Sequence, residues 1–440
     1  MLTWHYESRC SNPFRILLKR TLLLAVCMLF TPMAVAGVAV ITLEQAIKQT
    51  LSQNPAFELF AWRSKVLESH TDTANLSPAW VAGLEAENLM GSGEYSGFDS
   101  AEYTLSLSSV IELDDRRNAR VQVAHSRLAL DRARQQAQAL ELVSRVTRAF
   151  IHALIVQEKM RVAEVASALA EESFQLVDRR VKSGASPAAE KLRAQVDLQQ
   201  VQLNTHALER ELASAKFALR SFWADDNPAG STADSRLQGN LFLLDSAGNF
   251  AALMQKLESS QLMHVIANEQ QLREAEITLA KSRSAGDIEW GLGVRRFEGS
   301  GDSALTAGVS IPLFSGKRQQ SQVTTALARR EQVNAERDIT LRELKVKVYD
   351  AWQNYNHFAE VAKTTRSELL PLMEKALEQS RRFYERGRYS YTEWASVQRD
   401  LLDLQLSAID AAGTALLNRA LIEQMTGAAL PTDFSQTARP

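Results

Sequence analysis

The stretch Ser109-Val-Ile-Glu-Leu-Asp-Asp-Arg-Arg117 joins an alternating, strand-like segment to a helix-like one, and the chain uses this junction twice. Its counterpart, Ser310-Ile-Pro-Leu-Phe-Ser-Gly-Lys-Arg318, lies 201 residues later. A second pair of segments, Val181–Glu190 and Tyr384–Glu393, aligns at an offset of 203 residues. This repetition indicates that the 440 residues are one unit of about 200 residues used twice. Each half reads short helix, strand, loop, strand, long helix, glycine turn, helix.

Two long segments almost free of glycine and proline follow these junctions. Residues 116–183 contain neither, and residues 317–386 contain only Pro371, which we expect to bend a helix. As single helices they would each be about 100 Å long, far beyond most globular helices. After a short glycine turn, each continues into a second helix, over 188–224 or 389–426. Short connections of this kind favour antiparallel helical hairpins.

Four shorter segments, 78–90, 100–113, 287–297 and 303–314, alternate apolar and polar side chains and are joined pairwise by glycine-rich loops. Alternation over about ten residues is typical of an outer-membrane β-strand, although a soluble half-buried hairpin has the same pattern. In the first case Trp80, Tyr103 and Trp290 are candidate membrane-interface aromatics, and in the second they are ordinary strand packing.

Four strands per chain have a consequence for assembly. They cannot close a membrane barrel, and unpaired strand edges are not tolerated in lipid, so the chain must oligomerise. A dimer, a trimer or a tetramer would bring together about 8, 12 or 16 strands, and each total could close a barrel. The long helices, which all start near strand ends, would continue such a barrel as a tube on the periplasmic side.

The N-terminus has the pattern of a secretory signal peptide. Basic residues between positions 9 and 20 precede the apolar run TLLLAVCMLFTP, and Ala34-Val-Ala36 supplies a cleavage site before Gly37. The run is too short to span a bilayer, so we expect 1–36 to be removed on export. The alternative is a lipoprotein that uses Cys27, where the preceding Val26 is unfavourable.

Composition excludes several classes of function. The only cysteines are Cys10 and Cys27, which removes a disulfide scaffold, a cysteine zinc site and a cysteine nucleophile. Lys and Arg number 50 against 52 Asp and Glu, so no basic field favours nucleic acid. The seven histidines are scattered, and no catalytic or phosphate-binding motif occurs. We therefore predict no catalytic residue, no metal site and no cofactor.

Taken together, these features resemble the TolC family of outer-membrane efflux proteins over Gly37–Leu430. The Ile-Glu-Leu junction is most similar to the heavy-metal-exporter (CzcC-like) branch, although Asp114-Asp115 stand where that branch often has two glycines. The residues that carry the resemblance are Leu43-Glu-Gln-Ala-Ile47, Asn54-Pro55, Ile111-Glu-Leu with Arg116-Arg117, Ser310-Ile-Pro-Leu-Phe314 and the two glycine turns.

The resemblance implies a mainly α-helical fold with a β-barrel portion. A homotrimer would form a twelve-stranded barrel in outer-membrane lipid and a twelve-helix periplasmic tunnel. It would dock to a periplasmic adaptor and, through it, to an inner-membrane pump, expected to be of the RND type. The chain divides accordingly into a signal peptide (1–36), a first repeat (37–224), a linker (225–248), a second repeat (249–427, opening with a helix over 249–284) and a tail (428–440).

The two glycine turns are the candidate docking site, because they would lie farthest from the membrane. The family uses these turns to meet adaptor tips, whereas the alternative is that they are simple turns. Gly184 and Gly387 suit a left-handed helix cap. The candidate docking residues are Ser183, Gly184, Ala185, Arg386, Gly387 and Arg388.

Glu190 and Glu393 each follow a turn glycine by six residues, where the family tends to carry an aspartate that lines the closed entrance. A trimer would then hold a ring of carboxylates as its pore constriction, which would attract cations and raise the carboxyl pKa values. The alternative is that each acid simply favours a helix N-terminus. The candidate counter-ions of the gate are Arg180, Lys191, Arg193 and Arg388.

The expected function is that of an outer-membrane channel in a tripartite efflux system, and no enzyme activity is expected. It would be a passive conduit for metal cations or small toxic solutes, gated by relaxation of the helical hairpins at the entrance. Two alternatives remain at this point: a channel for type I protein secretion, and a periplasmic coiled-coil scaffold that does not enter lipid.

Overall fold

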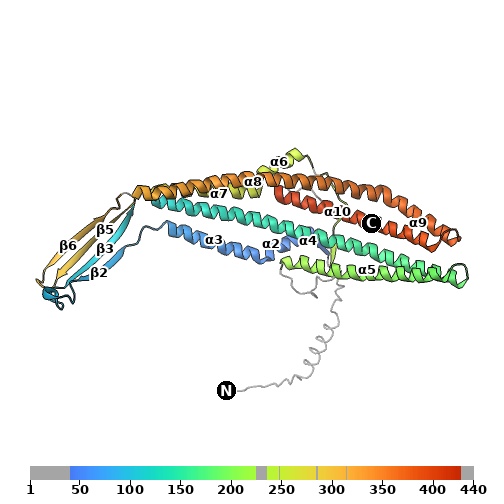
Figure 1. Ribbon diagram of the computed structural model, residues 1–440, viewed down its shortest axis with the longest axis horizontal. Coiled ribbons are helices and arrows are strands. Elements are labelled where there is room, and N and C mark those ends of the chain that lie inside the picture. The colour runs from blue at the N-terminus through green and yellow to red at the C-terminus, as the bar shows by residue number, and fades with distance from the viewer. Residues whose placement is uncertain (1–39, 224–234, 247, 284–285, 314, 428–440) are drawn as a thin grey trace, which may run out of the picture.

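The computed structural model describes residues 40–223, 235–246, 248–283, 286–313 and 315–427, and the chain forms a long rod (Figure 1). A four-stranded sheet occupies one end, and the turns of two helical hairpins lie at the opposite end. The expected signal peptide, the linker residues 225–234 and the tail 428–440 lie outside the described residues.

The sheet has the antiparallel order β2-β3-β5-β6, so the hairpins of the two repeats join through β3 and β5. The two edge strands, β2 and β6, are shorter than expected. Strand β6 stops two residues before Pro312, which has no N–H to donate to a ladder. The bounds are β2 Val81–Glu87, β3 Glu102–Glu112, β5 Asp287–Phe297 and β6 Ser303–Ser310.

The register of the sheet separates an apolar face from a polar one. One row across the four strands consists of Leu84, Leu105, Val294 and Leu305, whose exposed fractions are 77%, 62%, 49% and 87%. The next row, on the other face, consists of Gly83, Ser106, Gly293 and Thr306. A row of large aliphatic side chains that are about half or more exposed is the arrangement expected where a strand faces lipid.

Helix α4 (Arg116–Lys182) starts directly from the sheet because two residues take a left-handed conformation. The backbone angle φ is 57° at Asp114 and 56° at Asp115. Aspartate tolerates this region better than most side chains, and glycine tolerates it best. This geometry explains why an aspartate pair can stand where related junctions often carry two glycines.

Two expected helices are interrupted in the structure. The prediction of one helix over 317–386 is wrong, because a π-helical turn at Thr365–Leu369 separates α8 (Ser315–Thr364) from α9 (Leu370–Glu385). The turn lies just before Pro371, which has no N–H to continue the regular hydrogen bonds. The single helix over 249–284 is also wrong: α6 (Phe250–Glu258) and α7 (Gln261–Ser282) meet at Ser260, whose hydroxyl caps α7.

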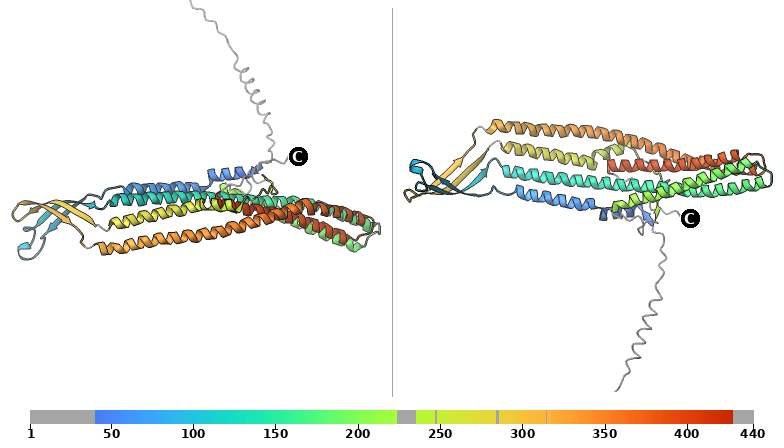
Figure 2. Two further views of the ribbon diagram at one scale, coloured as in Figure 1. Left: turned by 90° about the horizontal axis from the view of Figure 1, so that it is seen from above. Right: turned by 60° about the horizontal axis from the view of Figure 1, so that its bottom comes forward.

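The helices lie side by side in the same order as the strands. Near the sheet the order is α3 (Pro55–Ala74), α4, α7 and α8 (Figure 2). Towards the hairpin turns, α5 (Ala188–Arg220) and α10 (Tyr391–Thr426) replace α3 and α7, and α9 continues α8. Among the described residues, no helix combines the length and the apolar character needed to cross a bilayer.

The largest core among the described residues lies where helices of both repeats meet, part-way along the rod, and we call this region the waist. Phe150 and Leu154 of α4, Leu219 of α5 and Leu416 of α10 are buried there. The short strands β1 (Val40–Thr42) and β4 (Arg236–Gln238) pair in parallel beside them, and α2 (Leu43–Gln53) covers the same region. The waist therefore joins the two repeats and leaves the far ends of both hairpins projecting beyond it.

Candidate functional site at the hairpin turns

The two hairpin turns have the same backbone. The N–H of Gly184 donates to the carbonyl of Val181 at 3.0 Å, and the N–H of Ala185 donates to Arg180 at 2.8 Å. The second turn repeats this pair of bonds 203 residues later, with Gly387 at 2.9 Å and Arg388 at 2.8 Å. Both glycines have positive φ, 72° and 71°, which closes each helix in a Schellman motif. The sequence repeat therefore encodes a repeated helix cap.

The carboxylate of Glu393 belongs to a capping box at the start of α10. It accepts hydrogen bonds from the backbone N–H and the hydroxyl of Ser390, at 2.7 and 2.9 Å. The Ser390 hydroxyl accepts one in return from the N–H of Glu393. These bonds hold the pKa of the Glu393 carboxyl below its usual value, so the group is ionised at neutral pH. In a single chain, its surroundings stabilise the charge.

Glu190 reaches from the first hairpin to the same helix start. Its carboxylate accepts hydrogen bonds from the N–H of Tyr391 and the hydroxyl of Tyr384, both at 3.3 Å. The positive end of the α10 dipole favours both acids here. The structure thus brings Glu190 and Glu393 together at neighbouring backbone positions of one helix N-terminus.

Three of the four candidate counter-ions have other partners in the chain. Lys191 pairs with Asp178 at 2.7 Å, and Arg193 donates to the Thr392 hydroxyl at 2.7 Å. Arg180 donates to Ser186 and to the carbonyls of Ala185 and Glu385, and it lies over the Tyr384 ring. Within the ranges that the structure describes, none of the four forms an ion pair with Glu190 or Glu393.

A small aromatic core joins the two hairpins behind these groups, and sequence reasoning missed it. Trp394 stacks on Tyr384 with ring centroids 5.0 Å apart and meets Tyr391 edge-on at 6.2 Å. The three rings are buried together with Val177 and Ala194 of the first hairpin. Their clustering within eleven residues of sequence, around the second turn, was the only signal available.

Polar contacts between the hairpins surround this core. The Tyr391 hydroxyl donates to Asp197 at 2.8 Å, and burial together with that carboxylate raises the pKa of Tyr391. Arg381 and Glu172 pair at 2.6 Å on another side. The tyrosine therefore stays protonated and keeps donating across the accessible pH range, so the hairpins are held by packing and by hydrogen bonds.

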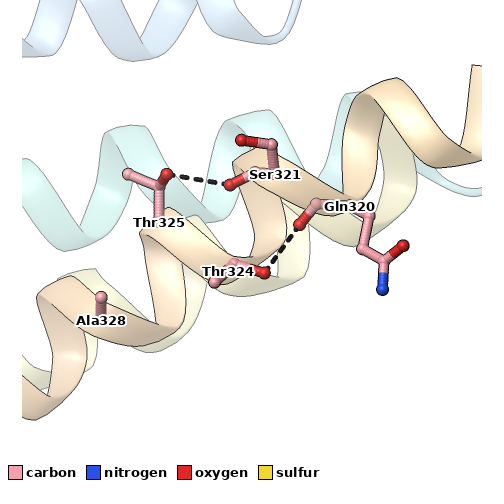
Figure 3. A pocket seen from close by; sticks show the side chains of 5 residues that line it. All are labelled: Gln320, Ser321, Thr324, Thr325 and Ala328. Atoms are coloured by element: carbon pink, nitrogen blue, oxygen red, sulfur yellow. Dashed lines mark hydrogen bonds between the residues drawn. The ribbon is translucent and has the colours of Figure 1, made fainter.

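A shallow hollow on α8, near the sheet, is the other notable surface feature (Figure 3). Its lining is short and polar, and the hydroxyls of Thr324 and Thr325 donate to carbonyls of their own helix at 3.0 and 2.9 Å. With their protons engaged there, these groups suit the close approach of another helix better than a ligand. The lining residues are Gln320, Ser321, Thr324, Thr325 and Ala328. Across the described ranges, no three His, Cys, Asp or Glu residues come together in a way that could hold a metal ion.

The sequence matches the profile of outer membrane efflux proteins over residues 47–225 and 252–428, which includes most of both repeats. The chain belongs to the outer membrane efflux protein family. This outer-membrane assignment confirms the family, the fold class and the efflux function that the sequence predicts. The alternative of a periplasmic coiled-coil scaffold that does not enter lipid is not supported by this assignment.

Individual relatives agree with this assignment. The cobalt-zinc-cadmium resistance protein CzcC of Cupriavidus metallidurans is 25% identical over 393 residues, which cover 88% of this chain and 90% of that protein. A crystal structure of CusC superposes with a TM-score of 0.75 at 17% identity, covering 88% of this chain and 92% of that one. For VceC of Vibrio cholerae the TM-score is 0.70 at 17% identity, covering 87% of this chain and 96% of that one. These structures share the fold of the efflux channel described here.

Proposed function

We propose that this efflux protein works as a homotrimeric, passive conduit for metal cations, docked by its hairpin turns to a periplasmic adaptor and an inner-membrane pump of the RND type. The open sheet supports the trimer. Within the described strands, β2 and β6 each pair on one side only, and lipid does not tolerate a free edge. Three copies would pair β6 of one chain with β2 of the next.

Apolar side chains on the edge helices support the same assembly. Helix α3 forms one edge and buries none of its residues within the chain, and its Trp62 is 59% exposed. Leu59 and Val66 are exposed on the same helix. On the opposite edge, α8 exposes Ile339 and Val346. A neighbouring copy would cover both edges and remove these side chains from water.

The polar face of the sheet would line the barrel, and its charge favours cations. Arg295 is shared between Glu87 at 2.8 Å and Glu102 at 2.9 Å, so one of these negative charges is not balanced by it. Glu85 and Glu289 are exposed on the same face and have no ion pair among the described residues. Rings of unpaired carboxylates attract cations to a pore. The metal-resistance name of the relative CzcC points to the same substrate class.

Removing these two charges is expected to weaken cation preference. In a planar bilayer with a KCl gradient, we expect the Glu85→Gln, Glu289→Gln double variant to lower the cation-to-anion permeability ratio at least about twofold. Glu94→Gln, in the loop beyond the strands, is the matched control and should leave the reversal potential unchanged. An unchanged reversal potential in the double variant would show that the barrel wall does not select cations.

Glu190 and Glu393 are proposed to form the constriction ring at the tunnel entrance of the trimer, with Arg180, Lys191, Arg193 and Arg388 nearby. Glu393→Gln tests this cleanly, because glutamine also supports a capping box and should preserve the start of α10. Block of the channel conductance by divalent cations should weaken in this variant, since a ring of charges is lost. If divalent cations block the conductance of the variant as strongly as that of the wild type, Glu393 does not form the constriction.

A further inference from the structure

The two hairpin turns share one backbone but present different side chains. The first turn exposes Ser183, Gly184 and Ala185, which are small and uncharged. The second turn exposes Arg386, Gly387 and Arg388 at the equivalent positions. Both turns lie at the end of the rod farthest from the sheet (Figure 1). Any partner that approaches this end therefore meets two unlike surfaces.

The cations closest to each turn differ in whether the chain already uses them; farther back on α4, exposed Arg179 also forms no ion pair with a described residue. Lys182, beside the first turn, pairs with Asp178 at 2.7 Å. Arg381, before the second turn, pairs with Glu172 and Glu385. By contrast, Arg386 and Arg388 form no ion pair with any described residue. Two guanidinium groups thus stand free on either side of the left-handed glycine.

An aromatic pair lies beside these two arginines. Phe383 and Tyr389 pack with ring centroids 5.2 Å apart, and the N–H of Tyr389 donates to the carbonyl of Phe383 at 3.3 Å. Tyr389 remains 40% exposed. Tyrosine and arginine are the residue types that most often dominate binding at interfaces, and a guanidinium fork matches a carboxylate in two-point contact.

We propose that the two turns are non-equivalent docking surfaces, and that Arg386, Arg388 and Tyr389 bind a carboxylate-bearing end of the adaptor's helical hairpin. This inference rests on the adaptor docking proposed above. Charge complementarity selects the occupant: two exposed cations without an ion pair among the described residues, at the outermost point of the rod, favour an acidic partner. The Ser183-Gly184-Ala185 turn instead admits close packing of a neutral surface, because its side chains are small.

Site-specific photo-cross-linking tests this assignment in the full-length chain. Benzoylphenylalanine would replace Tyr389 or, separately, Ala185, in membranes of a strain that also expresses its adaptor, and mass spectrometry would locate the attached adaptor residues. From position 389, we expect attachment to a hairpin end that carries Asp or Glu next to the attached residue. From position 185, we expect a different adaptor segment.

Charge reversal then separates the two surfaces. Arg386→Glu with Arg388→Glu should reduce cross-linking from position 389 about tenfold and leave the yield from position 185 nearly unchanged. Ser183→Glu is the matched control and should leave the yield from position 389 intact. Heat-modifiable trimers in every variant would show that the channel still assembles.

Three outcomes would overturn the proposal: an attached segment without acidic residues, equal losses from both positions, or full cross-linking from position 389 after charge reversal. A different result would overturn the proposed docking itself. If conducting trimers capture no adaptor from either position, the turns are not the docking site, and the inference fails with that premise.

Discussion

Replacing Trp394 by alanine is expected to open the turn end of the channel. The indole is buried between the hairpins, stacked on Tyr384 at 5.0 Å. Truncating a buried tryptophan costs about 3–5 kcal/mol. Part of that loss falls on contacts between the hairpins, because the same core includes Val177 and Ala194 of the first hairpin. We expect the mean single-channel conductance in planar bilayers to rise several-fold, because the hairpins separate more readily.

Gln175→Ala is the matched control for this experiment. Gln175 is exposed on α4, two residues from Val177 of the same core, and α4 lies between α5 and α10. Its truncation should change stability by less than about 0.5 kcal/mol and leave the conductance unchanged. Tyr391→Phe should give an intermediate effect, because it removes only the hydrogen bond to Asp197. Wild-type conductance in well-assembled Trp394→Ala trimers would contradict a packing lock at this end.

Replacing Gly413 by leucine is expected to prevent assembly of the channel. Gly413 is buried in α10 at the waist, where an added Cβ would lie 2.3 Å from Cδ1 and 2.6 Å from Cγ1 of Ile155 on α4. Either the Ile155 side chain must shift from its packed position or the two helices must move apart. Overpacking by one or two methylenes costs about 1–3 kcal/mol, and leucine adds more volume than that. We expect few or no heat-modifiable oligomers in outer-membrane fractions.

Gly413→Ala should fall between the wild type and the leucine variant. Alanine improves helix propensity by about 1 kcal/mol, which offsets part of the cost of the clash with Ile155. Asp403→Leu introduces leucine at an exposed position of the same helix and should assemble normally. If Gly413→Leu yields oligomers with the wild-type melting temperature, close contact between α4 and α10 at the waist does not hold the two repeats together.

The regular elements could be predicted because local residue patterns specify them. Helix α4 begins at Arg116 and ends at Lys182, within one residue of the expected range, because no glycine or proline interrupts it and a turn glycine follows. The alternation in the four strands predicts which side chains share a face, and the register agrees with it. Both patterns depend only on neighbouring residues.

The remaining features depend on contacts between distant residues. Nothing local to Glu190 indicates that its carboxylate meets the N–H of Tyr391, 201 positions away. Pro371 predicts a bend in the helix, but it does not specify that the backbone forms a π-helical turn there. The aromatic rings at the second turn contact one another within one hairpin, but Val177 and Ala194 of the first repeat complete their core.

We propose that this four-stranded chain becomes a channel only as a trimer. Native mass spectrometry of the protein, purified from outer membranes in detergent, measures the number of chains in the assembly. We expect a complex of three mature chains that dissociates into single chains on heating. A folded, outer-membrane-embedded complex of any other size, above all a single chain, would contradict it.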